Sequence, residues 1–387
     1  MKKSLLALAA MGAFASAAQA QSSVTVYGLY DGGYNGKVVE TKTSSTATAT
    51  VVSNSDLSGN QAASSRLGFR GNEDLGGGLS ATFNLELGFA PGNGTVTVTT
   101  VPGLAGQSQS DSGVRTSVVG LASKQFGALN IGRQLSGMHG IVAGNVFGGN
   151  NMVGDITYSS FTNSNAIAGR ISNNVTRFNG ASWTSPSFSG LTARVDYSAS
   201  RATGAASASA SGQTDGNTTA LQVSNSGFRV NYDYKQFGVS AGTHKVISTN
   251  GNVASTTGAE TTNTINALQA RYRDKGLLAE VTYANNKAES ASAQVHKNSA
   301  LKFSASYAVT PVITPFVQYG TGVSASTVSV SAANTTNNNV GYQAGVTYSM
   351  SKRTNLYAAY GYQKSENKTS TASVEGREAA VGILHTF

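Results

Sequence analysis

Sixteen segments of this chain place apolar residues at every second position, with small or polar residues between them. In residues 78–90, for example, Phe83 and Leu85 fall on one face, and Asn84 and Glu86 fall on the other. Successive side chains of a β-strand point to opposite faces of a sheet, so each segment predicts a strand with one apolar face. The expected strands run over 23–34, 64–72, 78–90, 113–121, 127–134, 171–184, 189–199, 219–235, 237–247, 262–274, 276–287, 296–308, 312–322, 337–350, 353–364 and 375–387.

The connections between these segments alternate strictly between long and short. Residues 35–63 are followed by 73–77, and residues 91–112 by 122–126, a pattern that continues to the C-terminus. The short connections are rich in turn residues such as Gly and Asp, and the long ones are polar tracts of Thr, Ser and Asn. An up-and-down membrane barrel, with short periplasmic turns on one side and long external loops on the other, produces this asymmetry.

The composition favours a membrane barrel over a soluble fold. Charged residues make up 12% of the chain, about half of the roughly 25% that is usual in globular proteins. After residue 20 no stretch approaches the ~18 continuous apolar residues of a spanning helix. An antiparallel sheet with one wet face is the alternative, but no segment is left over to cover sixteen apolar faces. We therefore expect an all-β, 16-stranded antiparallel transmembrane β-barrel, whose interior is too wide for side chains to fill.

The N-terminus predicts export. Lys2 and Lys3 precede a short apolar stretch, and Ala18 and Ala20 frame a small-residue cleavage site. We expect residues 1–20 to be a signal peptide and residues 21–387 to be the barrel domain, although an N-terminal membrane anchor is the alternative. Without Lys2 and Lys3 the 27 basic residues fall to 25 against 18 acidic residues, which leaves a formal charge of +7.

Several segments resemble recurring motifs of the Gram-negative general porins, in the branch found in beta-proteobacteria. They are VTVYGLYD at 24–31, SRLGFRGNEDLGGGL at 65–79, FGALNIGRQ at 126–134 and the terminal Phe387. The resemblance implies a homotrimer in the outer membrane, in contact with its lipids and lipopolysaccharide. It also implies passive diffusion of small ions and hydrophilic solutes, and a terminal aromatic, Phe387, that the barrel assembly machinery reads as a signal.

The resemblance further implies a constriction. Residues 135–170 correspond to a long loop that folds into the barrel, where wall arginines face acidic loop residues. Arg66, Arg115 and Arg170 match those arginines, and Asp155 is the only carboxylate in the loop. Arg66 is opposite in phase to Leu67 and Phe69, and Arg115 shares the phase of Ser117. The acidic residue usual after the Phe-Gly-Gly segment is replaced here by Asn150 and Asn151.

Further charged residues fall on the inward phase of their strands and are expected to line the lumen. They are Glu86, Arg194, Arg229, Arg271 and Arg273. Together with the constriction arginines they predict a lumen that attracts anions. A structural role for the arginines, in which they pair with Glu86, Asp31 or Asp196 to satisfy the wall, is the alternative.

Other functions find little support in the sequence. The chain has no Cys and only four scattered His residues, so it predicts no disulfide, metal site or cofactor. No hydrolase or phosphate-binding motif indicates an enzyme, and the cations are dispersed singly rather than clustered as for nucleic acid. A passive, anion-preferring diffusion channel is the expectation. A substrate-specific outer-membrane channel and a barrel adhesin remain as alternatives.

Overall fold

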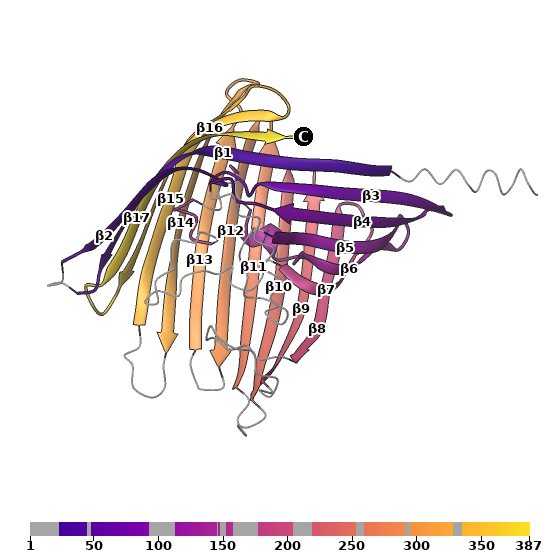
Figure 1. The fold of residues 1–387 in the computed structure, drawn as a ribbon, viewed down its shortest axis with the longest axis horizontal. Coiled ribbons are helices and arrows are strands. Elements are labelled where there is room, and N and C mark those ends of the chain that lie inside the picture. Colours follow the sequence, from indigo (N-terminus) through magenta and orange to yellow (C-terminus); the bar gives the residue numbers. More distant parts are fainter. Residues whose placement is uncertain are drawn as a thin grey trace, which may run out of the picture.

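The computed structural model describes residues 23–44, 48–92, 113–144, 146–147, 152–157, 177–203, 219–252, 259–290, 295–327 and 335–387. These residues form one antiparallel sheet that closes on itself, because the first strand pairs with the last (Figure 1). The expected signal peptide, residues 1–20, lies outside the described residues and stays a prediction.

Nearly all of the described chain is strand. The strands are β1 (Ser23–Lys42), β2 (Thr50–Gly59), β3 (Arg66–Gly76), β4 (Leu79–Gly88), β5 (Gly113–Ser123), β6 (Gly127–Leu135), β7 (Arg177–Thr184), β8 (Leu191–Thr203), β9 (Thr219–Tyr234), β10 (Phe237–Asn252), β11 (Ala259–Asp274), β12 (Leu277–Ser290), β13 (Val295–Tyr307), β14 (Ile313–Thr327), β15 (Thr335–Ser349), β16 (Thr354–Asn367) and β17 (Ser373–Thr386). One short helix, α2 (His139–Val142), follows β6. Within the described ranges, no helix is long and apolar enough to cross a membrane.

The seventeen strands occupy sixteen positions around the barrel, as the sequence predicts. β2 pairs with residues 32–41 of β1, and β3 pairs with residues 23–29 of the same strand. β2 and β3 therefore share one position in the barrel. The prediction that residues 35–63 form only a connection is wrong, because β1 continues to Lys42 and β2 returns beside it. Val39 and Val52 face each other across this pair. β-branched Val and Thr favour strands even in a stretch whose polar composition is typical of a loop.

Residues 60–65, between β2 and β3, turn around the carboxylate of Asp31 on β1. Asp31 Oδ2 accepts hydrogen bonds from the backbone N–H groups of Ala62 at 2.8 Å and Ala63 at 2.9 Å. Asn60 enters this turn with φ of 70°, in the left-handed region that Asn tolerates better than most residues. The turn restores the ladder at Arg66, so it sets where that arginine enters the lumen.

The two faces of the wall differ as the alternation predicts. On β17, Val381 and Ile383 are 53% and 42% exposed on the outer face, whereas Glu378 and Ala380 on the inner face are each 3% exposed. Eight aromatic residues of the wall are also exposed: Tyr30, Tyr34, Trp183, Tyr232, Tyr307, Tyr319, Tyr360 and Phe387. The apolar surface of this barrel is therefore on its outside, where lipid can cover it.

The short connections are tight turns, as expected. Between β11 and β12 the two residues Lys275 and Gly276 have φ of 44° and 84°. Positive φ at both positions is what a two-residue hairpin turn of type I′ requires. Glycines 76–78 likewise have positive φ between β3 and β4. These turns fix the register of the strands on either side.

The chain terminus completes the closure. Phe387 N–H donates to Gly28 O at 3.1 Å, and Gly28 N–H donates to Phe387 O at 3.0 Å. The Phe387 ring lies against Gly28, where a Cβ would overlap it. The last residue thus adds a reciprocal pair of hydrogen bonds to the seam between β1 and β17.

Deleting Phe387 is expected to lower the amount of folded protein in the outer membrane, because it removes this pair of hydrogen bonds and the terminal aromatic together. Phe387→Tyr keeps both features and should give the parental amount. Heat-modifiable protein measured by gel electrophoresis of outer membranes checks this. Equal amounts in the deletion and parent strains would contradict the expected role of Phe387.

Candidate functional site in the barrel lumen

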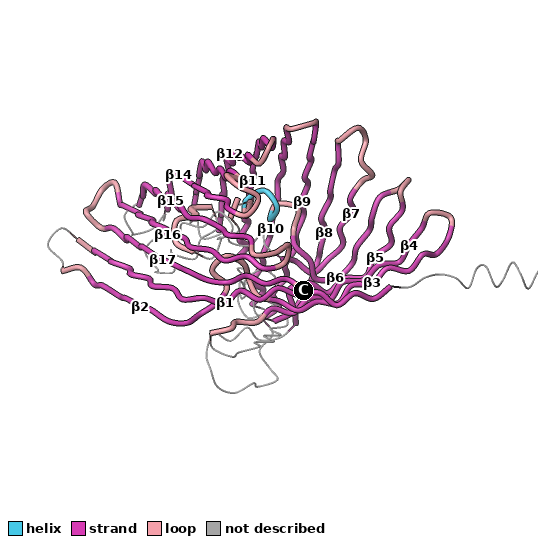
Figure 2. The backbone as a smooth tube through the Cα atoms, turned by 90° about the horizontal axis from the view of Figure 1, so that it is seen from above, coloured by secondary structure: helices cyan, strands magenta, loops and turns pink. Residues whose placement is uncertain are grey.

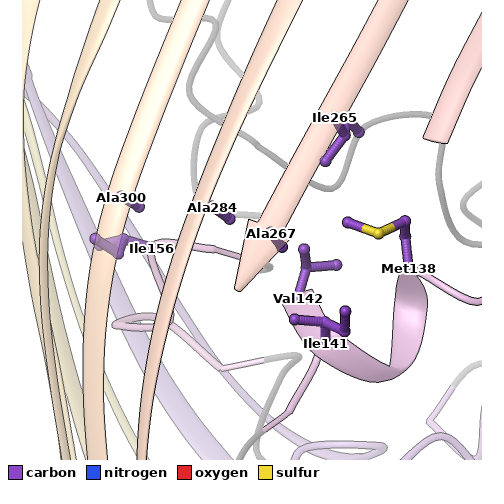
Figure 3. Close-up of a cluster of buried hydrophobic side chains, with 8 residues drawn as sticks. All are labelled: Met138, Ile141, Val142, Ile156, Ile265, Ala267, Ala284 and Ala300. Atoms are coloured by element: carbon purple, nitrogen blue, oxygen red, sulfur yellow. The ribbon is translucent and has the colours of Figure 1, made fainter. Parts of the chain in front are cut away.

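The segment that follows β6 lies against the inner face of the wall. Its described residues are 136–144, 146–147 and 152–157, and they are called the bound segment below. Met138, Ile141 and Val142 of α2 and its flank pack on side chains of β11, β12 and β13, together with Ile156 further along the segment (Figure 3). The wall residues in this cluster are Ile265, Ala267, Ala284 and Ala300. Figure 2 shows α2 beside this part of the sheet. The small alanines let the helix approach the wall closely.

A buried ion pair fixes the same segment. Lys302 Nζ on β13 lies 3.2 Å from Asp155 Oδ2, and the two side chains are 1% and 0% exposed. Lys302 also donates to Gly144 O at 2.7 Å and to Thr157 Oγ1 at 2.9 Å. Thr157 Oγ1 in turn lies 2.8 Å from Val142 O. One lysine therefore joins two stretches of the segment, at Gly144 and at Asp155 and Thr157. The Asp155 carboxylate also accepts hydrogen bonds from Thr157 N–H at 3.0 Å and Thr157 Oγ1 at 2.7 Å.

Replacing Lys302 by Met is expected to destabilise the bound segment and to increase brief closures of the channel. Removing one partner of a buried ion pair costs about 3–5 kcal/mol, because the other charge stays buried without compensation. The double variant Lys302→Met, Asp155→Asn removes both charges and should return the closures toward the parental frequency. Single-channel recording checks this, and equal closure rates in the single and double variants would show that the ion pair does not hold the segment.

A second set of contacts reaches the wall near the barrel seam. The ring of Phe147 stacks on Phe316 of β14, with centroids 4.2 Å apart. Val153 N–H donates to Glu378 Oε2 at 2.8 Å, and Gln343 Nε2 donates to Val153 O at 3.1 Å. A Cβ at Gly361 of β16 would overlap Val153 O, so only glycine admits the backbone here. The segment is thus held along β11 to β17.

The other side of the lumen carries guanidinium groups around one carboxylate. Arg115 Nε on β5 donates to Glu86 Oε1 at 2.6 Å, and Arg66 Nη1 on β3 lies 3.9 Å from the same oxygen. Tyr27 OH lies 3.1 Å from Glu86 Oε2. Eight strand positions separate β5 from β13 in a ring of sixteen, so this arginine cluster lies opposite the Lys302 anchor.

A β-bulge turns Arg115 into the lumen. Leu87 of β4 pairs with Val114 and Glu86 pairs with Thr116, which leaves Arg115 as the extra residue. Val119, on the phase that a regular strand would give Arg115, is 62% exposed on the outer face. The inward position of Arg115 therefore comes from the bulge and not from simple alternation, since bulges redirect side chains.

Two further arginines bind the beginning of the segment. Arg194 Nε on β8 donates to Asp196 Oδ1 at 2.7 Å, and Arg194 Nη2 donates to Leu135 O at 2.6 Å. Arg229 Nη1 on β9 donates to Gly137 O at 3.1 Å, and Gly137 N–H donates to Asp196 Oδ2 at 2.6 Å. The Arg194 side chain is 24% exposed, so it pairs with Asp196 of the wall and is still in contact with water.

The predicted site residues thus fall into separate places. Arg66, Arg115 and Glu86 come together, and Asp155 is bound to the opposite wall instead of facing them. Arg271 pairs with Asp233, and Arg273 is exposed beside the turn after β11. Arg170, with Asn150 and Asn151, lies outside the described residues.

Sequence reasoning missed several residues that organise the lumen. Glu378 and Gln343 hold the backbone of the segment, and Lys302 anchors it. All three fall on the inward phase of their strands, which predicts a lumen position but not a partner. The sequence allows Asp31 as a partner for arginine, but the described contacts of its carboxylate are with the 60–65 turn and with Tyr357 OH at 2.8 Å. Among the described residues, no group of His, Cys, Asp and Glu could hold a metal ion.

A protein-family model described as Gram-negative porin matches residues 7–368 of the chain. Among curated proteins, an outer membrane porin protein of Bordetella pertussis is 34% identical over 210 residues, which cover 51% of this chain and 48% of that protein. Outer membrane porin protein 32 of Delftia acidovorans is 44% identical over 94 residues, 22% of each chain. The chain therefore spans about half or less of the length of these relatives.

Solved structures share the fold over nearly the whole length. An anion-selective porin from Comamonas acidovorans superposes with a TM-score of 0.64 at 23% identity, covering 95% of this chain and 100% of that one. The trimer form of OmpT, an outer membrane protein of Vibrio cholerae, gives a TM-score of 0.58 at 16% identity, covering 95% and 99%. At these identities the likeness concerns the fold alone.

Proposed function

Because the chain belongs to the family of Gram-negative porins, we propose that it forms a passive aqueous channel for small hydrophilic solutes and ions, with a preference for anions. The chain lies in the outer membrane of a Gram-negative bacterium and crosses it many times through its strands. The channel needs no cofactor or energy source, and we propose no catalytic role. A barrel of sixteen strands leaves an interior wide enough for water.

The observation that carries this proposal is the division of the lumen into two unlike halves. The bound segment covers the wall from β11 to β17, and the arginines project from β3 to β9 on the other side. We propose that residues 135–170 form the constriction and that solutes pass between this segment and the arginines. The exposed parts of Arg66 and Arg194 would meet them first.

The anion preference follows from how the carboxylates are engaged. Glu86 is shared by two guanidinium groups, and the charge of Asp155 is matched by Lys302 on the far wall. Cations therefore exceed anions on the arginine side, and in a channel such fixed charge raises the local concentration of the opposite ion. We propose that Arg66 and Arg115 contribute most, with Arg170 as a further member and Arg229, Arg271 and Arg273 as lining.

We also propose that the protein is a homotrimer, that outer-membrane lipids and lipopolysaccharide surround it, and that the barrel assembly machinery inserts it. The existence of a trimer form among the similar solved structures supports the first of these. The exposed apolar outer face, with aromatic residues such as Tyr319 and Tyr360, supports the second.

Liposome swelling tests the proposed function. Liposomes that contain the purified protein should swell in uncharged sugars at rates that fall smoothly with solute size and show no saturation. A substrate-specific channel would saturate and would favour one sugar over others of equal size. Absence of swelling with correctly folded protein would contradict a diffusion channel and would favour the alternative that the barrel is an adhesin.

A further inference from the structure

The inner wall has a polar groove on the turn side of the cluster formed by Arg66, Arg115 and Glu86. Its volume is about 430 Å³, within the range of about 300–1,000 Å³ that is usual for small-molecule sites. Polar side chains of β1, β3, β4 and β6 line it: Thr25, Arg70, Asn72, Thr82, Asn84 and Asn130. Arg70 is the one charged residue of the lining, so we call this cavity the Arg70 groove.

Strand pairing arranges the lining in two rows on the inner face. In the first row, Thr25 lies in register with Arg70, and Arg70 lies in register with Asn84. In the second row, one step toward the turns, Asn72 lies in register with Thr82. Neighbouring strands are about 4.8 Å apart, and a step of two residues along a strand is about 7 Å. Guanidinium, amide and hydroxyl groups therefore lie within the span of one small molecule.

Neighbouring residues orient two of the amides. Gly120 of β5 lies in register between Thr82 and Asn130, and a Cβ at Gly120 would overlap Asn130 Oδ1. Because glycine stands there, the Asn130 side chain can lie across β5 on the inner face. In the first row, Tyr27 OH lies 2.8 Å from Asn84 Oδ1 and fixes this amide from the side of the arginine cluster.

Arg70 differs from the arginines of the cluster in its partners. Arg66 and Arg115 share Glu86, whereas within the described ranges Arg70 has no carboxylate partner. Its guanidinium lies over the ring of Tyr27, 5.2 Å from the ring centroid, and its side chain is exposed. A guanidinium held on an aromatic ring can still donate two parallel N–H bonds to a carboxylate. Arg70 is therefore a cation held in place beside amide and hydroxyl groups.

We propose that the Arg70 groove binds sugar acids, which are sugar rings with one carboxylate and several hydroxyl groups, such as hexuronic acids. The carboxylate accepts hydrogen bonds from Arg70. The ring hydroxyls bond to Asn84 in the same row and to Asn72 and Thr82 in the next. A neutral sugar lacks the group that Arg70 binds, and a simple carboxylate lacks the groups that the amides bind. The inference rests on the proposed function in one respect, namely that solutes pass through the lumen.

Ligand binding is measured first without conductance, by saturation-transfer NMR of the purified full-length protein in detergent. Glucuronate should bind to the parent. Cyclohexanecarboxylate has a six-membered ring and the carboxylate but no hydroxyl groups, and glucose has the hydroxyl groups without the carboxylate. Each should bind at least about fivefold more weakly than glucuronate, since each loses hydrogen bonds with the groove.

Substitutions then assign the site. Arg70→Gln should weaken glucuronate binding about tenfold, because hydrogen bonds to a charged group are lost. Lys235→Gln is the matched control, since Lys235 Nζ also lies 5.2 Å from a tyrosine ring centroid, that of Tyr234, but at the turn after β9. It should bind glucuronate as the parent does. The double variant Asn72→Leu, Thr82→Val should weaken glucuronate binding and leave cyclohexanecarboxylate binding unchanged.

The outcomes separate the site from folding and from the channel. All variants should stay heat-modifiable, and the comparison of ligands on the parent decides the matter even if one variant does not fold. Equal binding of glucuronate by the parent and Arg70→Gln would overturn the inference, as would equal binding of glucuronate and cyclohexanecarboxylate by the parent. In planar bilayers, glucuronate should reduce the parental chloride current with saturation, and less so in Arg70→Gln. Glucuronate binding without any conductance would contradict the proposed channel and leave the groove as a binding site.

Discussion

Removal of residues 145–154 is expected to raise single-channel conductance well above the parental value while the barrel remains folded. The described residues in this stretch, such as Phe147 and Val153, lie on the inner wall near the seam, so they occupy part of the proposed path. The barrel itself is held by the hydrogen bonds of sixteen strand positions, to which the segment does not contribute. Planar-bilayer recording in symmetric salt measures the effect.

The structure defines where the chain can be rejoined. Gly144 O and Asp155 Oδ2 both lie against Lys302 Nζ, at 2.7 and 3.2 Å, so the two residues to be joined contact the same side chain. An equal deletion within 204–218, between β8 and β9, serves as the control. A conductance equal to the parent in the 145–154 deletion would mean that the segment does not limit the current.

The second large effect concerns charge selection. Replacing Arg66 and Arg115 by Gln should lower the anion-to-cation permeability ratio, whereas Glu86→Gln should raise it, because the three groups form one cluster. At about 10 Å one charge in water changes the energy of a passing ion by roughly 0.4 kcal/mol before screening, so we expect about a twofold to fourfold change in the ratio near 0.1 M salt. The change should shrink at 1 M, where the Debye length is only ~3 Å.

Reversal potentials under a KCl gradient measure this ratio. Arg377→Gln is a suitable control, because Arg377 lies on the outer face, where 52% of its side chain is exposed beside Glu375. If the double arginine variant keeps the parental permeability ratio, Arg66 and Arg115 have a structural role in the wall and do not determine ion selectivity. The same conclusion holds if Glu86→Gln changes the ratio in the direction opposite to that expected.

Much of this fold could be predicted because a barrel wall repeats one simple rule. The phases of Val381 and Glu378 on β17, and of Phe83 and Glu86 on β4, follow directly from alternation. Tight turns such as Lys275–Gly276 mark the strand ends with residues that accept positive φ. These signals are local, so a single sequence contains them in full.

Other features depend on contacts between distant residues and could not be predicted. Arg115 faces the lumen through a bulge that exists only against Glu86 and Leu87 of the neighbouring strand. Asp155, as the only acid in its loop, was expected to face the arginines, but Lys302, 147 residues away, holds it on the other wall. The polar composition of residues 35–63 is typical of a loop and did not predict β2. This strand depends on its pairing with β1, in which Val52 lies opposite Val39.

The most direct test of the proposed channel is recording from the unmodified protein in a planar bilayer that separates two KCl concentrations. We expect discrete conductance steps, a current that rises linearly with voltage, and a reversal potential whose sign shows that chloride passes more readily than potassium. Folded protein that inserts without conductance steps would contradict the proposed channel. Steps with a potassium-favouring reversal potential would contradict the proposed role of the arginine wall.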